Sequence, residues 1–260
     1  MNDFSQKCVR FSILLGGLVL AACGSTDLNS DGISSTDEPI IGGTTDNGDP
    51  SVVAIFAHAP NSNYGSLCTG TVISSRAVLT AAHCVDPRLV GSGMVFDVYT
   101  GTNFGSSSTR LSTSSTAFDP AFDPSRLGNG HDIAVVTLSR PTSLMPVPFN
   151  RSALTSSSLS TPVRLVGYGS STHLNSGAGI KRTVTTSLDA ITTALVKIGA
   201  SNQQTCHGDS GGPALQNIGG VETIIGVTSF GSDPSPNDVC EGGGYDTRVD
   251  VYSSFINAHL

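Results

Sequence analysis

The sequence contains no tryptophan, and only 13% of its 260 residues are charged. It has 30 glycines instead, and serine and threonine are frequent throughout. These residue types favour short strands joined by many turns over long helices. No internal repeat is visible. The composition therefore predicts an all-β protein.

A basic cluster and a long apolar run are also missing. The net charge is −7, and the acidic residues are scattered along the chain. Without clustered lysine or arginine, nucleic acid is excluded as a partner. The apolar run at Phe11–Leu20 is too short to span a bilayer comfortably. It is typical of an export signal instead.

The first 22 residues are predicted to be that export signal. Lys7 and Arg10 supply the positive charge that precedes the apolar run. The run ends in Leu20-Ala21-Ala22-Cys23, which resembles a bacterial lipobox and implies a lipid on Cys23. The alternative is ordinary secretion with cleavage near Ala22. We therefore expect an exported protein, lipid-anchored at the bacterial cell envelope or released to the extracellular space.

Residues 23–39 are predicted to be an acidic tether or propeptide, since they lack apolar periodicity. Within them, Asp27 to Glu38 matches the spacing of a calcium-binding loop. No helix can precede this loop so soon after Cys23, and Pro39 follows it directly. The acidic linker is therefore the favoured interpretation, and calcium binding is the alternative.

Three short motifs carry the candidate chemistry. Ser210 lies in Cys206-His207-Gly208-Asp209-Ser210-Gly211-Gly212-Pro213, where glycines let the backbone approach a substrate closely. A serine is a weak nucleophile without a base and an orienting acid. Upstream, Thr80-Ala81-Ala82-His83-Cys84 supplies a histidine, and His131-Asp132-Ile133-Ala134 supplies an acid. The chain order is therefore His, Asp, Ser.

This order decides between two interpretations of the serine motif. The spacing Gly208-x-Ser210-x-Gly212 also fits the nucleophile elbow of α/β-hydrolases. That fold needs the order Ser, Asp, His. After Ser210 the only histidine is His259, the penultimate residue. The α/β-hydrolase interpretation therefore fails.

From about Ile40 to the C-terminus, the three motifs closely resemble the chymotrypsin/trypsin-like serine proteases. The resemblance implies two packed six-stranded antiparallel β-barrels and a short C-terminal helix, in a protease domain at residues 40–260. We expect strands of the first barrel at residues 51–58, 68–74, 77–81, 94–100 and 132–138. Strands of the second barrel are expected at 161–168, 184–188, 213–216 and 222–230, and a closing helix at 249–260.

The resemblance also implies a role for each motif residue. Ser210 would be the nucleophile, His83 the general base and Asp132 the residue that orients the imidazole. The N–H groups of Gly208 and Ser210 would form the oxyanion hole. This chemistry needs no cofactor and no metal. We expect a serine endopeptidase that hydrolyses peptide bonds through an acyl-enzyme, as a monomer acting on protein or peptide substrates.

Activation and disulfides are inferred in the same way. The start Ile40-Ile41-Gly42-Gly43 resembles that of the mature proteases, in which the freed amino group pairs with the aspartate before the serine, here Asp209. An activating protease is then a partner, although Pro39 is not the usual residue before the cut. Cys68 with Cys84, and Cys206 with Cys240, are the implied disulfides, which indicate an oxidising compartment.

The specificity pocket is expected to be neutral and polar, because Gln204 takes the position of its floor. The resemblance implies these substrate-binding residues: Gln204, Thr205, His207, Ser229, Phe230, Gly231, Gly244 and Asp246. Asp246 is expected near the back wall of this pocket, so a pocket that contains an acidic group is the alternative. The alternative function is a catalytically silent binding protein of protease fold, or a locked zymogen.

Overall fold

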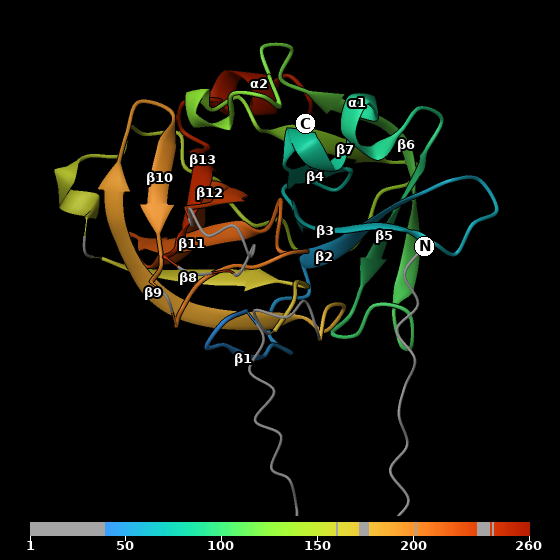
Figure 1. The fold of residues 1–260 in the computed structure, drawn as a ribbon, viewed down its shortest axis with the longest axis horizontal. Helices are drawn as coiled ribbons and strands as arrows, with labels where there is room; N and C mark the ends of the chain where they lie inside the picture. The colour runs from blue at the N-terminus through green and yellow to red at the C-terminus, as the bar shows by residue number, and fades with distance from the viewer. Residues whose placement is uncertain (1–39, 160, 172–176, 201, 233–239, 241) are drawn as a thin grey trace, which may run out of the picture. The chain divides into compact units, whose positions relative to one another are not determined.

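The computed structural model describes residues 40–260 except 160, 172–176, 201, 233–239 and 241. The predicted export signal, Cys23 and the tether up to Pro39 lie outside the described residues. Short antiparallel strands dominate the described part (Figure 1). Within it, none of the helices is long and apolar enough to span a membrane.

Six strands close the first barrel, in the ring order β2-β3-β4-β7-β6-β5. Their residues are β2 Val52–His58, β3 Gly65–Val72, β4 Ala77–Thr80, β5 Val95–Thr100, β6 Thr109–Phe118 and β7 Ala134–Leu138. Apolar, β-branched runs such as the buried Ala77–Thr80 fit a pleated surface that is covered on both sides.

The second barrel is a ring of six strands in which β8 also pairs with β9 and so closes the sheet. Its order is β9-β10-β13-β12-β11-β8. The strands are β8 Pro162–Gly167, β9 Arg182–Ile191, β10 Leu195–Ile198, β11 Pro213–Ile218, β12 Val221–Gly231 and β13 Gly244–Arg248. A two-residue strand β1, Thr44–Thr45, adds to β9. The prediction of two closed antiparallel barrels is therefore confirmed.

Several strands and the helix differ from the prediction in detail. The strands β6, β10 and β13 had not been predicted, because β6 is rich in exposed serine and threonine, β10 is only four residues long and β13 begins at a glycine. The closing helix α2 covers only Ser253–Asn257. It starts late because the Val249 N–H bonds to the Ile225 carbonyl of β12.

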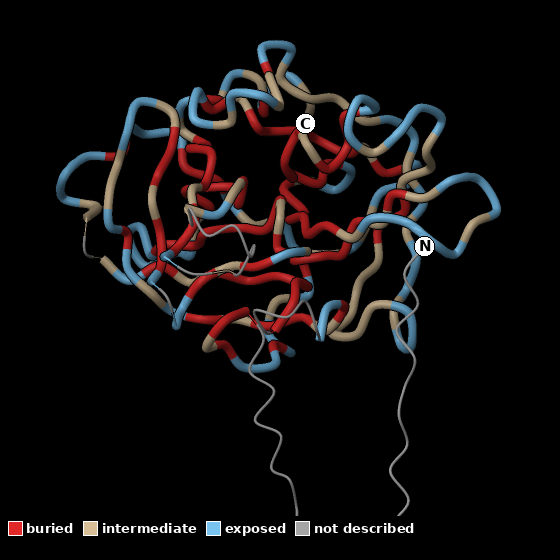
Figure 2. Tube along the Cα trace, in the orientation of Figure 1, coloured by how far each residue is buried: buried red, intermediate tan, exposed pale blue. Residues whose placement is uncertain are grey.

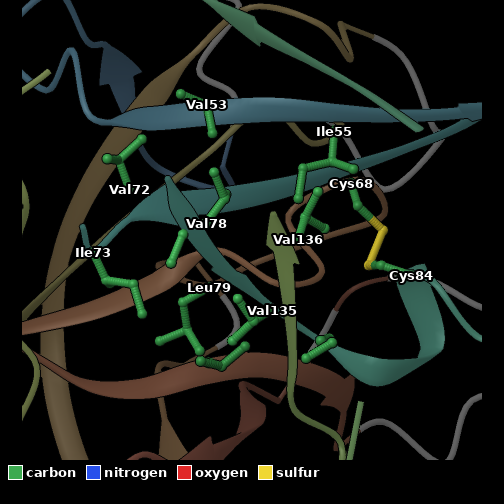
Figure 3. Close-up of a cluster of buried hydrophobic side chains, with 14 of the residues drawn as sticks. Val53, Ile55, Cys68, Val72, Ile73, Val78, Leu79, Cys84, Val135 and Val136 are labelled. Carbon is green, nitrogen blue, oxygen red and sulfur yellow. A yellow bond between two sulfur atoms is a disulfide. The ribbon is translucent and has the colours of Figure 1, made fainter. Parts of the chain in front are cut away.

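Buried side chains form two clusters. The larger one fills the first barrel and continues into the second through residues such as Val166 and Val227. The smaller one lies inside the second barrel and includes Ile40. Figure 2 shows the buried segments along the barrel strands, and Figure 3 shows the Cys68–Cys84 disulfide at the edge of the larger cluster. This shared core packs the two barrels against each other.

Candidate active site

His83 lies on a short 3₁₀ helix, Ala82–Cys84, directly after β4. Ala81 and Ala82 are fully buried on either side of this junction. The disulfide from Cys84 to Cys68 ties the helix to β3 (Figure 3). The His83 side chain remains 22% exposed. The segment is therefore fixed to the first barrel while the imidazole faces outward.

Asp132 is fully buried just before β7 and accepts three hydrogen bonds. Its Oδ1 accepts from the His83 backbone N–H at 2.9 Å, and its Oδ2 accepts from His83 Nδ1 at 2.7 Å. The Ser229 hydroxyl of β12 donates to Oδ2 at 2.5 Å. An ionised carboxylate can only accept, so Nδ1 carries the proton and Nε2 keeps its lone pair. The histidine is thereby set up as a base.

The loop that carries Ser210 is bonded to both barrels. The Ser210 carbonyl accepts the Thr69 N–H of β3 at 2.8 Å, and the Gly211 N–H donates to the Thr228 carbonyl of β12 at 2.9 Å. Cys84 Sγ lies 3.7 Å from the Ser210 carbonyl oxygen. The serine backbone is therefore packed against the segment that holds the histidine.

Close packing of this loop requires glycine at position 211. Its φ is +81°, and a Cβ there would lie 2.0 Å from Thr80 Oγ1 and 2.4 Å from the Thr69 carbonyl oxygen.

Within the described part of the chain, Ser210 Oγ has no hydrogen-bond partner. Catalytic hydrogen bonds are often long before substrate binds.

The two expected oxyanion donors are free to bind a ligand. Neither the Gly208 N–H nor the Ser210 N–H donates to any described residue. Gly208 has a φ of +97°, and its carbonyl is turned away to accept the Thr69 hydroxyl at 2.9 Å. Both N–H groups therefore remain available to a substrate oxygen.

Asp209 is buried behind this loop and is held by backbone donors. The Gly169 N–H reaches its Oδ1 at 2.7 Å, and the Cys206 N–H reaches its Oδ2 at 2.9 Å. Burial raises the pKa of Asp209 to about 7, against the lowering effect of these two bonds. A Cβ at Gly169 would lie 2.5 Å from the carboxylate. The glycine at 169 therefore leaves the space that the Asp209 carboxylate fills. Ile40 is fully buried in the same barrel.

The expected pocket residues fall on three segments. Both ends of the Gln204 amide bond to backbone, since Nε2 donates to the Cys240 carbonyl and Oε1 accepts the Gly243 N–H at 2.8 Å. Thr205 lies opposite Gly244, where a Cβ would be 3.2 Å from its Oγ1. These contacts hold the Cys206–Cys240 disulfide region together.

The remaining pocket residues differ in exposure. Phe230 stacks on Tyr245 at a ring distance of 5.1 Å. His207 is exposed and its carbonyl accepts the Ser170 N–H, while Gly231 ends β12 at the surface. Asp246 is buried, at 1% exposure. The structure therefore brings Ser229 to Asp132 and Thr205 to Gly244, and it buries Asp246 in the barrel.

Two contributions were missed by the sequence reasoning. Ser229 was expected at the substrate edge, yet its hydroxyl bonds to Asp132. Thr69 holds the serine loop through its N–H and its hydroxyl. Both act across 97 residues or more, so no local pattern could have indicated them.

Cysteine and histidine come together in two places among the described residues. These are Cys68, His83 and Cys84, and Cys206, His207 and Cys240. All four cysteines are joined in the two disulfides that the resemblance implied. A disulfide sulfur is not a thiolate ligand, so these groups are poor candidates for a metal site.

Comparison with known proteins agrees with this geometry. The Trypsin family model matches residues 40–256. Chymotrypsin-like elastase family member 1 from Bos taurus is 28% identical over 244 residues, covering 85% of this chain and 90% of that protein. Trypsin, alkaline C from Manduca sexta is 27% identical over 249 residues, covering 86% of this chain and 92% of that protein. The chain therefore belongs to the trypsin family of chymotrypsin-like serine proteases.

Proposed function

We propose that the protein is a serine endopeptidase that uses Ser210, His83 and Asp132 as its triad. The observation that carries this is the bond from His83 Nδ1 to a fully buried Asp132, next to the segment that packs on Ser210. Family membership supports a serine protease hydrolase, and the triad roles are our assignment.

The geometry supports a two-step reaction. Ser210 Oγ attacks the scissile carbonyl carbon and passes its proton to His83 Nε2. The carbonyl oxygen takes up negative charge between the N–H groups of Gly208 and Ser210. His83 then gives the proton to the leaving amine, which departs and leaves an acyl-serine. Water, deprotonated by His83, attacks this ester, and His83 returns the proton to Ser210 Oγ as the acyl–oxygen bond breaks and the acid is released.

Activation is the second part of the proposal. Cleavage before Ile40 would free an ammonium group that could pair with Asp209, whose buried carboxylate accepts the Gly169 and Cys206 N–H groups. If Cys23 carries a lipid, the same cut would release the protease from its anchor, because the two disulfides both lie within residues 68–240. Cell fractionation with N-terminal sequencing would test this release.

An activity probe tests the triad directly. A fluorophosphonate should label the mature protein, and Ser210→Ala should abolish both labelling and peptide hydrolysis. Ser66→Ala is the control, since Ser66 is an exposed serine on β3. Mature protein can be made by placing a specific cleavage site before Ile40. Labelling of another serine, with activity intact in Ser210→Ala, would contradict the mechanism.

The same experiment separates the alternative functions. A protease that is activated by cleavage should take up the probe only after the cut before Ile40. A locked zymogen or a catalytically silent binding protein would take up no probe in either form. Two chain disulfides are consistent with an exported protein, so the cut and uncut proteins should be prepared under oxidising conditions.

A further inference from the structure

The residue before the triad acid has an unusual backbone conformation. His131 has a φ of +67°, in the left-handed region that residues other than glycine seldom adopt. Such a conformation is unfavourable and persists only where the surrounding contacts fix it. Since Asp132 follows directly, the contacts that hold His131 also set the direction in which the chain enters the triad acid.

Hydrogen bonds close the chain on both sides of Asp132. The Tyr252 hydroxyl oxygen accepts the His131 N–H at 2.8 Å, across 121 residues of sequence. The His131 carbonyl accepts the Ile133 N–H at 2.9 Å, which makes a tight turn centred on Asp132. The Ile133 carbonyl accepts the Asp119 N–H at 3.1 Å. The Tyr252 hydroxyl therefore ties this turn to the C-terminal end of the chain.

Tight packing fixes the position of this hydroxyl. Tyr252 is 7% exposed and belongs to the larger buried cluster. Its ring lies edge-on to the His131 ring, with the two centroids 5.2 Å apart. A Cβ at Gly130 would lie 2.7 Å from the hydroxyl oxygen and 2.6 Å from Ala194 Cβ. The hydroxyl thus occupies a gap that a glycine at position 130 leaves open.

The helix α2 holds the backbone of the same tyrosine. Tyr252 directly precedes α2, and its carbonyl accepts the Ile256 N–H at 3.0 Å. Ile256 is fully buried in the larger cluster. The contact therefore runs from the closing helix, through the tyrosine hydroxyl, to the backbone beside the triad acid.

The Asp132 carboxylate depends on an accurate backbone position because its two oxygens meet different donors. Oδ1 accepts the His83 backbone N–H, and Oδ2 accepts His83 Nδ1 and the Ser229 hydroxyl. A small rotation of the backbone would lengthen at least one of these bonds. Misplacement of a catalytic group by about 1 Å can lower a rate about 100-fold. The position of the Asp132 backbone therefore decides how well the imidazole is held.

We propose that Tyr252 is a positioning residue of the triad, whose hydroxyl holds His131, and through it Asp132, where the carboxylate orients the imidazole. The inference rests on the proposed function and extends it to a side chain outside the three sequence motifs. The hydroxyl acts through the backbone of the triad acid. Its loss therefore slows the reaction of every substrate and leaves substrate binding intact.

The test removes the hydroxyl and keeps the ring, with Tyr252→Phe. Mature parent and variant are assayed on peptide amides with Arg or Leu before the cut bond and one common chromogenic leaving group. We expect kcat to fall about tenfold for both substrates, the order expected when a buried N–H loses its acceptor. KM should stay within about twofold, as for an interaction that matters only in the transition state.

Two controls make the kinetic result specific. Active-site titration with the fluorophosphonate gives kcat per competent enzyme, so that unfolded material does not count as a loss. Tyr64→Phe is the matched variant, because Tyr64 is 89% exposed and carries the same hydroxyl. Its kcat should equal that of the parent.

A spectroscopic signal separates positioning from general stability. The proton on His83 Nδ1 lies in the 2.7 Å bond to Asp132, and its NMR resonance reports the geometry of that bond. In the mature Ser210→Ala protein, which cannot digest itself, Tyr252→Phe should shift this resonance and Tyr64→Phe should not. If Tyr252→Phe does not fold, amide exchange in the parent decides. A buried and bonded His131 N–H exchanges slowly, and fast exchange overturns the inference.

Each other outcome counts against the inference. A kcat in Tyr252→Phe equal to that of the parent overturns it. A loss of stability with kcat per active site and the resonance both unchanged makes the hydroxyl a purely structural group. In these cases only this inference fails, provided that the parent cleaves substrate and is labelled at Ser210. If the parent cleaves no substrate and no serine is labelled, the proposed function fails with it.

Discussion

Two buried carboxylates, one at the seam between the barrels and one inside the second barrel, differ in how they are satisfied. Asp132 is fully buried and accepts three hydrogen bonds from His83 and Ser229. Asp246 is 1% exposed, and its Oδ2 has no partner among the described residues. Equal burial therefore does not mean equal chemistry. A fully bonded acid positions its neighbour, whereas the carboxylate of Asp246 keeps one oxygen without a described donor.

One strand supplies the donors for both acids. Thr228 and Ser229 are adjacent on β12, and successive side chains of a strand point to opposite faces. Ser229 turns to Asp132, and Thr228 turns to Asp246. This alternation places the Ser229 side chain beside Asp132 and the Thr228 side chain toward the interior of the second barrel. The comparison predicts that changes at the first acid lower the hydrolysis of every substrate, while changes at the second alter how the stability of the fold depends on pH.

The largest expected effect is at Asp132. In triads of this kind, the aspartate-to-asparagine change lowers kcat by about 10⁴, and we expect a loss of that order for Asp132→Asn. The amide nitrogen would donate to His83 and favour the tautomer whose Nε2 is protonated. Steady-state kinetics on Arg and Leu substrates should show the same loss for both. A loss below tenfold, or one confined to Arg, would erase the contrast with Asp246.

The sequence motifs predicted the parts that depend on local context. The resemblance of these motifs to a known family implied the pairing of Cys68 with Cys84 and of Cys206 with Cys240, and the two-barrel fold, and the structure confirms both. The roles of the triad residues remain predictions, although the structure brings His83 and Asp132 into contact.

The parts that depend on distant contacts could not be predicted. The strand β6 has few apolar residues because much of it is exposed, so alternation was weak. The bond from Ser229 to Asp132 arises from the meeting of two barrels. The burial of Asp246 depends on a glycine at 226 on the neighbouring strand. None of these contacts is encoded within a single motif.

A smaller effect is expected from the two neighbours on β12. Ser229→Ala removes one donor from Asp132, and a hydrogen bond to a charged group contributes about 1.5 to 3 kcal/mol. We expect kcat to fall about tenfold or slightly more, equally for Arg and Leu substrates, with KM unchanged. Thr228→Val changes the residue opposite Asp246 in the β12–β13 pair and should leave kcat within about threefold of the parent. Parallel kinetics of the two variants measure this, and an equal loss in both would contradict it.

The smallest effect concerns the pH dependence of stability. Burial raises the pKa of Asp246, like that of Asp209, to about 7 from an ordinary value of 3.8. The folded state therefore holds these protons more tightly than the unfolded state. Their contribution to stability is fully present below pH 3.8 and is lost as the pH rises to about 7. The slope cannot exceed about 1.4 kcal/mol per pH unit for each group.

Unfolding by denaturant at several pH values measures this slope. The uncut Ser210→Ala protein avoids self-digestion, and adding Asp246→Asn should flatten the fall in stability between pH 5 and 7. Acids such as Asp49 and Asp86 have lowered pKa values, so their contributions change only below this window. An unchanged slope with Asp246→Asn would mean that Asp246 is compensated in the folded state, and the two acids would then be alike.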